Sequence, residues 1–187
     1  MPRLPDRLLD GLLTLNPCSR AGEYAREART DMNATPKIRL ARQSDVPNVA
    51  FLVSQYWQFE QIAGFDRAHI EKILSGLISL PERGACWVAE NAETISGYLI
   101  AVYVFSLEHG GTIAELDEFF VRPEFRSGGT GAALLSESER EMRGAGIVRM
   151  QLQLGLTNDR ARFFYERHGY RRRSGYELYE KTLLPSR

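Results

Sequence analysis

The stretch VRPEFRSGGTGAALL, residues 121–135, overlaps the end of an apolar, strand-like run (LDEFFV, 116–121) and leads into the helix-forming segment AALLSESEREMR. Glycines placed between a strand and a helix leave several backbone N–H groups uncovered. These donors add to the positive end of the helix dipole and form a site for phosphate. The stretch therefore predicts a strand–loop–helix unit that binds a ligand bearing a diphosphate.

Two familiar phosphate loops do not match this stretch. No Gly-Lys-Ser/Thr follows the glycines, which argues against a Walker loop. The preceding strand is not the first of a βαβ series with a ribose-binding acid downstream, which argues against a dinucleotide fingerprint. Taken alone, a glycine-rich turn is explained equally well by a purely structural helix start.

The composition favours one compact, cytoplasmic domain. The 187 residues are 43% hydrophobic, and 24 Lys and Arg balance 24 Asp and Glu, so no global field attracts nucleic acid or an anionic membrane. Cys18 and Cys86 match no ligand or redox spacing, which fits a reducing compartment and indicates no metal site. No apolar run approaches the roughly 18 residues of a membrane span.

Residues 1–35 mix charges with one apolar patch and are interpreted as an N-terminal extension, whereas residues 36–187 carry regular patterns and are interpreted as the domain. The pattern predicts these elements in order: a strand at 38–41, a helix that begins after Ser44-Asp45, a helix that Asp66 caps and that ends at Pro81, a hairpin of strands 85–90 and 94–107, and a strand at 112–121.

The second half of the chain continues the alternation of helix and strand. A helix at about 129–143 precedes a strand at 148–154, and Asn158 or Asp159 caps a short helix, 159–169. Two closing strands are expected at 170–173 and 176–183. Together the elements predict a mixed α/β domain with one central sheet.

Two motifs in this order resemble the GCN5-related N-acetyltransferase (GNAT) superfamily. The first runs Val121-x-Pro123-Glu124-Phe125-Arg126-x-x-Gly129-x-Gly131, and the second comprises Asn158, Ala161 and FFYERHGY at 163–170. The resemblance extends more loosely from Ile38 to the last predicted strand. It implies the GNAT fold, a single central mixed and mostly antiparallel sheet flanked by helices on both faces, and acetyl-CoA as co-substrate. It also allows a homodimer formed through the last strands.

The resemblance assigns acetyl-CoA binding to the end of the strand, the glycine loop and part of the second motif: Phe119, Phe120, Val121, Arg126, Ser127, Gly128, Gly129, Thr130, Gly131, Ala132, Asn158, Ala161 and Phe164. Many members of the superfamily have Gly directly after the Arg, where this chain has Ser127. We expect Ser127 to keep a negative φ and Gly128 to take the positive φ that the turn needs. The diphosphate site is then expected to survive.

Transfer of an acetyl group from a thioester to an amine requires a proton for the departing thiolate. A thiol has a pKa near 8.5 and a tyrosine near 10, so Tyr165 can deliver that proton. The resemblance implies this role, because a Tyr at this position is the usual general acid of the superfamily. The alternative is that Tyr165 packs with Phe163 and Phe164 as an ordinary aromatic cluster.

Three acids in the apolar strand TIAELDEFFV are candidates for the general base. Strict alternation puts Glu115 and Asp117 on one face of the strand and Glu118 on the other. One carboxylate would take the proton of the attacking ammonium, directly or through water, and another would hold a cationic substrate. The alternative is that this end of the strand emerges into solvent.

The local string LDEFFV looks like the LEDFFV-type strand of the small-amine and polyamine branch, with its two acids exchanged. Asp117 then falls where that branch has its catalytic Glu, and its shorter side chain favours a relay through water. Glu115 matches the base position of the histone-acetylating branch. We rank Asp117 first, Glu118 second and Glu115 third.

The end of the same strand and the first helix supply the remaining expected site residues. The backbone N–H of Val121 is expected to polarise the thioester carbonyl, because a strand that splays from its neighbour leaves such a donor free. Asn158 is interpreted as a helix cap, and the resemblance adds a contact to the pantetheine arm. The expected substrate-binding residues are Phe59, Glu60, Asp117, Gln151 and Gln153, while Trp57 is interpreted as a core side chain.

The sequence therefore predicts an acetyl-CoA-dependent N-acetyltransferase that acts on a primary amine of a small cationic molecule, by direct attack in a ternary complex. One alternative is a protein or peptide N-acetyltransferase, which needs an open groove in place of an acidic pocket. Another alternative is a non-catalytic module that binds acetyl-CoA as a sensor.

Overall fold

A computed structural model describes residues 35–183. The predicted N-terminal extension lies outside the described residues except for its last residue, and so do residues 184–187. Internal contacts divide the chain into two compact units, and the division falls between Gln151 and Leu152. Along the described residues, no helix is both long and apolar enough to cross a membrane.

The first unit is built on a sheet with the strand order β1-β2-β3-β4-β5. The strands are β1 (Lys37–Leu40), β2 (Gly84–Asn91), β3 (Thr94–Ser106), β4 (Gly111–Val121) and β5 (Arg149–Leu152). Strands β1 to β4 form three antiparallel pairs, β1 with β2, β2 with β3 and β3 with β4.

The short strand β5 lies beside the first half of β4. Val148 N–H donates to Thr112 C=O at 3.0 Å, and the side chain of Gln151 reaches Glu115. The two contacts keep the same offset along the chain, so β5 runs parallel to β4. The sheet is therefore mixed and mostly antiparallel, as the sequence predicted.

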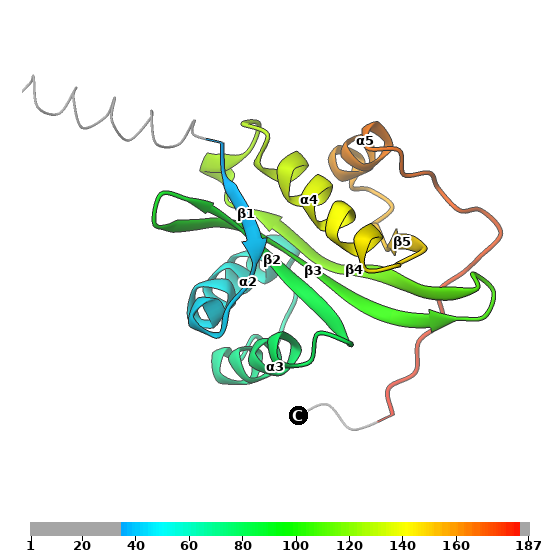
Figure 1. Cartoon of the computed structure of the whole chain (residues 1–187), viewed down its shortest axis with the longest axis horizontal. Helices are drawn as coiled ribbons and strands as arrows, with labels where there is room; N and C mark the ends of the chain where they lie inside the picture. The colour runs from blue at the N-terminus through cyan, green and yellow to red at the C-terminus, as the bar shows by residue number, and fades with distance from the viewer. Residues whose placement is uncertain (1–34, 184–187) are drawn as a thin grey trace, which may run out of the picture. The chain divides into compact units, whose positions relative to one another are not determined.

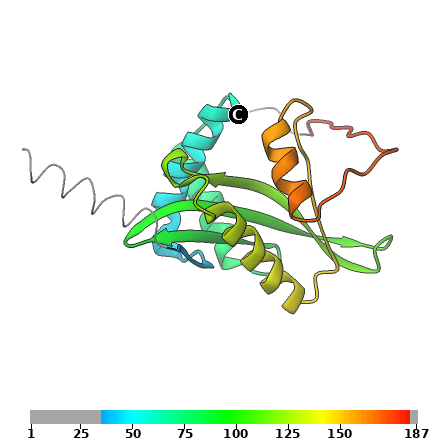
Figure 2. The ribbon, with the colours of Figure 1, turned by 90° about the horizontal axis from the view of Figure 1, so that it is seen from above.

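Helices cover both faces of this sheet (Figure 1). Helices α2 (Val46–Glu60) and α3 (Arg67–Ser79) lie on one face, and α4 (Thr130–Gly144) lies on the other. Figure 2, which looks down on the sheet, shows α4 in front of the strands and α2 and α3 behind them.

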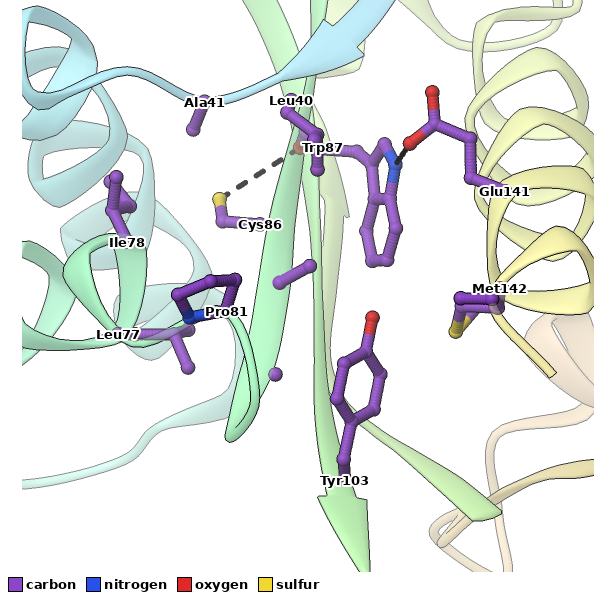
Figure 3. Close-up of a pocket in the computed structure, with 13 residues that line it drawn as sticks. Leu40, Ala41, Leu77, Ile78, Pro81, Cys86, Trp87, Tyr103, Glu141 and Met142 are labelled. Atoms are coloured by element: carbon purple, nitrogen blue, oxygen red, sulfur yellow. Dashed lines mark hydrogen bonds between the residues drawn. The ribbon is translucent and has the colours of Figure 1, made fainter. Parts of the chain in front are cut away.

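The two layers follow from the alternation of side chains along β2. Cys86 and Val88 belong to the buried cluster formed with α2 and α3. Trp87, between them, points to the opposite side of the strand and donates its indole N–H to Glu141 of α4 at 2.7 Å (Figure 3). The apolar run of β2 from Cys86 to Ala89 is thus buried on both faces of the sheet.

Sequence signals at the helix ends are confirmed. Helix α2 begins at Val46 with Pro47 in its first turn, where a missing N–H costs nothing. The Asp66 carboxylate accepts from the N–H of His69 at 3.0 Å and caps α3. Helix α3 ends at Ser79, before Pro81.

An ion cluster ties β1 to the start of α2 and to β2. The Arg39 guanidinium lies 2.6 Å from an Asp45 oxygen and 2.9 Å from a Glu90 oxygen. The Arg42 backbone N–H also donates to Asp45 at 2.7 Å. Side-chain hydrogen bonds from Arg39 hold the pKa of Asp45 below its usual range. Asp45 therefore acts through this cluster, and its side chain makes no capping bond to α2.

Within its described residues, 152–183, the second unit contains one helix, α5 (Asp159–Arg167). The Asn158 side chain accepts from the N–H of Ala161 at 3.1 Å, which selects Asn158 over Asp159 as the cap. The predicted closing strands at 170–173 and 176–183 are wrong, because no strand forms there. Alternation of polar and apolar residues cannot make a strand unless another strand pairs with it. Among the described residues of this unit, 152–183, only Leu152, the last residue of β5, is in a strand.

Candidate active site

A bulge in β4 determines how its three acids point. Ile100 of β3 pairs with Glu118, and the next residue, Ala101, pairs with Leu116, so Asp117 is an extra residue without a partner across the ladder. Adjacent residues of β3 face opposite sides of the sheet. Leu116 and Glu118 therefore face opposite sides, which corrects the strict alternation that the sequence predicted.

The corrected pairing places two of the three acids on the same face of the sheet. Glu115 pairs with Val102 and Glu118 pairs with Ile100, two β3 residues on the same face of the sheet. Because Ile100 belongs to the buried cluster with α2 and α3, this face is the one that α2 covers. Glu115 and Glu118 thus share a face, with Asp117 at the bulge between them.

Glu118 is held by two donors. One carboxylate oxygen accepts from Trp57 Nε1 at 2.7 Å, and the other accepts from the Tyr98 hydroxyl at 2.7 Å. Burial raises the pKa of Glu118, while these two bonds to the ionised form oppose the rise. The side chain is thereby fixed in one orientation.

Sequence reasoning missed both partners of Glu118. Trp57 was interpreted as core, and its ring does pack on Phe65 with centroids 5.9 Å apart, but its N–H is committed to the carboxylate. Tyr98 is fully buried in an apolar strand. A hydroxyl-bearing aromatic in a strand next to an acidic strand was the available signal, since a buried Tyr hydroxyl needs a partner.

Asp117 differs from Glu118 in exposure. Its side chain is exposed, yet the surrounding protein displaces enough water to raise the pKa of Asp117, and the charge of Glu115 raises it further. Glu115 receives a long hydrogen bond, 3.4 Å, from the amide of Gln151. Gln151 therefore lies beside Glu115. Gln153 lies beyond the end of β5, is exposed and belongs to the second unit.

The last turns of α2 face the same acids. Burial raises the pKa of Tyr56 to about 12, with further contributions from the charges of Glu60, Glu118 and Asp117. That phenol therefore lies within the field of three carboxylates and stays protonated at neutral pH. Phe59 and Glu60, the two predicted substrate residues of this helix, are exposed at its end.

The loop between β4 and α4 differs from the expected backbone at two residues, Ser127 and Gly128. A short turn at Pro123–Phe125 precedes Arg126, and then Ser127 itself takes φ +66°. Gly128 has no positive φ, whereas Gly129 has φ +88°. The expectation that Gly128 relieves Ser127 is wrong. The turn requires its left-handed residue one position earlier, where the chain has Ser.

The start of α4 presents uncovered donors. The first backbone bond of the helix runs from Ala133 N–H to Gly129 C=O at 2.9 Å. The N–H groups of Thr130, Gly131 and Ala132 precede it, and no side chain caps this end. No acidic residue occupies the first turn. These are the properties that the glycine-rich stretch predicted for a phosphate site.

At the end of β4, the backbone N–H and C=O of one residue point away from β3. Gly97 pairs with Val121, and the next bond runs from Arg122 N–H to Ser96 C=O at 2.9 Å, which marks the pair as non-hydrogen-bonded. The N–H and C=O of Val121 therefore point away from β3. Its C=O accepts from Arg126 Nε at 2.7 Å.

The second unit carries the predicted acid. Tyr165 is buried at 8% exposure, and its ring contacts Phe164 and Tyr170 at centroid distances of 5.3 Å and 5.4 Å. Phe163 is 62% exposed and takes no part in that cluster. Asn158 and Ala161 form the start of the same helix, so the motif residues of α5 are close in space within this unit.

A pocket of about 220 Å³ in the first unit contains none of the predicted site residues (Figure 3). Its walls are mostly apolar and come from the ends of α3 and α4 and the start of β2. Burial raises the pKa of the Cys86 thiol in its wall to about 12, so this thiol stays protonated. Among residues 35–183, no group of three or more acids, histidines or cysteines is placed to hold a metal ion.

Comparisons with known proteins agree with the fold described above. The family model described as "Acetyltransferase (GNAT) family" matches residues 46–170. The chain is 32% identical over 142 residues to the protein named "Uncharacterized N-acetyltransferase YhfO" of Bacillus subtilis (strain 168), which covers 76% of this chain and 94% of that protein.

Two further proteins are similar over most of the chain. The "Aminoglycoside N(6')-acetyltransferase type 1" of Klebsiella aerogenes is 24% identical over 128 residues, 68% of this chain and 84% of that protein. The crystal structure of an integron cassette protein from the mobile metagenome of Cole Harbour Salt Marsh superposes with a TM-score of 0.70 at 28% identity, covering 80% of this chain and 91% of that one.

Proposed function

The chain belongs to the acetyltransferase (GNAT) family, and from that membership we propose that it transfers the acetyl group of acetyl-CoA to a primary amine of a small cationic molecule. The amine attacks the thioester directly in a ternary complex. The observation that carries the choice of acceptor is the gathering of acids on the α2 face of β4, within reach of the end of α2.

The uncovered donors at the start of α4 support the site for the co-substrate. The N–H groups of the loop from Ser127 to Ala132 would bind the diphosphate, where the helix dipole favours negative charge and no acid opposes it. Phe119 to Val121 would line the pantetheine arm. The Val121 N–H, which points away from β3, would polarise the thioester carbonyl.

The acids support a cationic acceptor. Glu60, Asp117 and Glu118 all act on the phenol of Tyr56, so an ammonium bound there meets a concentrated negative field. Glu118 is oriented by Trp57 and Tyr98 and would hold that charge. The similarity to a protein named as an aminoglycoside N(6')-acetyltransferase favours the same class, because aminoglycosides carry several amino groups.

Asp117 would serve as the base. It is exposed at a bulge, so a water molecule can reach it, and its raised pKa makes it a better proton acceptor than an ordinary Asp. Glu118 has each oxygen already engaged by a donor, which fits a positioning role better than a proton relay. Tyr165 would return a proton to the departing CoA thiolate.

The test is the release of CoA thiol from acetyl-CoA in the presence of single amines: polyamines, diamines, amino acids, aminoglycosides and basic peptides. We expect turnover with one small-amine class, and loss of most of it in Tyr165→Phe and Asp117→Asn. Glu93→Gln, at the β2–β3 turn, is the matched control and should retain full activity. Turnover with basic peptides alone would replace the small amine by a protein acceptor, and full activity in Tyr165→Phe would remove that residue from the mechanism.

A further inference from the structure

The side chain of Arg126 turns back from the cofactor loop toward the sheet and helix α2. Its Nε donates to the C=O of Val121 at 2.7 Å. Its guanidinium carbon lies 5.3 Å from the ring centre of Phe120 and 5.4 Å from that of Phe59. Both distances are within the range of cation–π attraction.

These contacts connect two sites that the backbone keeps apart. Phe59 lies in the last turn of α2. Tyr56 and Trp57, which face the acids of β4, precede it in the chain, and Glu60 follows it. Phe120 packs on Tyr56 at 6.1 Å and on Tyr98 at 6.4 Å between ring centroids. A row of aromatic side chains thus runs from Arg126 to Tyr98, whose hydroxyl ends on Glu118.

We propose that Arg126 is a positioning residue that couples the acetyl-CoA site to the acceptor site. The proposal rests on the proposed function. The diphosphate fixes the loop backbone through its N–H groups, and Arg126 then fixes the last turn of α2 through Phe59. Acetyl-CoA binding therefore raises the affinity for the acceptor, and the reciprocal effect is equal by linkage.

The chemistry of the contact requires an arginine. The planar guanidinium can lie against two rings while its Nε bonds a carbonyl, and neither a lysine nor a glutamine does both. Arg126→Gln removes the contact with Phe59 while leaving the backbone N–H groups at the start of α4 in place for diphosphate binding.

A second arginine in the same loop provides the control. The Arg122 guanidinium lies 5.7 Å from the ring centre of Phe125 and pairs with Glu124 at 2.6 Å. Like Arg126, it lies near an aromatic ring, but its polar partner is a carboxylate, and both of its side-chain partners are loop residues. Arg122→Gln should weaken the loop locally without affecting α2.

Hydrogen exchange of the whole chain with free CoA tests the coupling without any amine. In the wild type and in Arg122→Gln, we expect CoA to slow exchange both in the loop, 122–132, and in the end of α2, 56–62. In Arg126→Gln and Phe59→Leu, we expect loop protection to persist and at least half of the α2 protection to be lost. The double variant should lose no more than either single variant, because both break one contact.

Steady-state kinetics give a second readout. Substitution of a residue with only a structural role would not change it in the way described here. With kanamycin A as the amine, Arg126→Gln should raise the KM for the amine about two- to fivefold, the effect of one exposed cation–π contact. The KM for acetyl-CoA should change less. Arg122→Gln, which leaves Phe59 and Arg126 intact, should retain the wild-type KM for the amine.

Each contrary outcome has a distinct meaning. Equal CoA protection of α2 in the wild type and Arg126→Gln, or a KM effect confined to acetyl-CoA, overturns the coupling and leaves the proposed function standing. Absence of any CoA protection in the wild-type loop overturns the cofactor site of the proposed function, and the coupling with it.

Discussion

At the scale of single residues, the bulge at Asp117 separates the roles of neighbouring acids. Without it, Glu118 would lie across the sheet from Glu115; with it, both face α2 and Asp117 stands exposed between them. Bulges recur beside active sites because they re-aim a side chain without breaking the ladder on either side. Two predictions follow from the different surroundings of Asp117 and Glu118.

Asp117→Asn should lower kcat by about 10²-fold, the lower end for loss of a general base, since water can still accept the proton poorly. Activity of the wild type should fall as the pH drops through the pKa of Asp117, which lies above the usual value of about 3.9. The variant should lack this acidic limb. The pH dependence of kcat/KM checks it, and an unchanged limb in the variant would assign the base to another residue.

Tyr98→Phe removes one of the two donors that stabilise ionised Glu118. Because those bonds lower the pKa, their loss should raise the pKa of Glu118 further. We expect a cost of about 1 kcal/mol in unfolding free energy and a KM for the amine that rises more steeply toward acidic pH. Trp57→Phe should act in the same direction. An amine KM that depends on pH as in the wild type would show that Glu118 does not hold the acceptor.

At the scale of elements, the loop between β4 and α4 contains a residue that its conformation disfavours. A left-handed backbone costs an L-residue roughly 1–2 kcal/mol, and Ser127 adopts it at φ +66°. The adjacent Gly128 does not relieve it. Such a residue persists because the surrounding loop, which ends at the uncovered N–H groups of α4, fixes its position.

The effect of a substitution at Ser127 should therefore depend on how readily the new residue adopts a positive φ. Ser127→Gly should leave stability unchanged or raise it by up to about 1 kcal/mol and should preserve CoA affinity. Ser127→Val should lower both, because a β-branched residue at positive φ is a strong outlier. Urea unfolding and calorimetric titration with CoA measure the two effects. Equal affinity in the Gly and Val variants would mean that the loop changes shape when CoA binds.

At the scale of the whole molecule, the first unit is stabilised by an ion cluster as well as by its hydrophobic core. Arg39 joins the edge strand β1 to Asp45 at the start of α2 and to Glu90 of β2. The side chains of Arg39 and Asp45 are only 15% and 10% exposed, so this pair is little screened by solvent. Removing one partner leaves the other charge poorly solvated.

Asp45→Asn should lower the unfolding free energy at pH 7 by about 2 kcal/mol. The pKa of Asp45 is lowered by folding, so its contribution is present above the ordinary Asp pKa of about 3.9 and is lost as the pH falls through the lower folded pKa. The difference between wild type and variant should narrow across that window. Urea unfolding at several pH values measures it, with Glu71→Gln, which breaks the exposed Arg67–Glu71 pair, as a control of small effect.

Much of the fold could be predicted from local chemistry. Helix starts at Pro47 and Asp66, the β2–β3 hairpin and the cap by Asn158 follow from residues within a few positions of each other. The loop at the start of α4 was likewise predicted from its glycines. These features depend on the intrinsic preferences of short segments, which the sequence displays directly.

The remaining features depend on partners far along the chain. The bulge at Asp117 arises from the pairing of β3 with β4, and the donors to Glu118 come from α2 and β3. The absence of strands at 170–173 and 176–183 reflects the absence of a paired edge in their unit. The sequence by itself determined the family, the layered sheet and the acids available for chemistry. Only the tertiary structure decided which acid is exposed and which is held, because a one-residue shift between two strands reverses the face of every side chain beyond it.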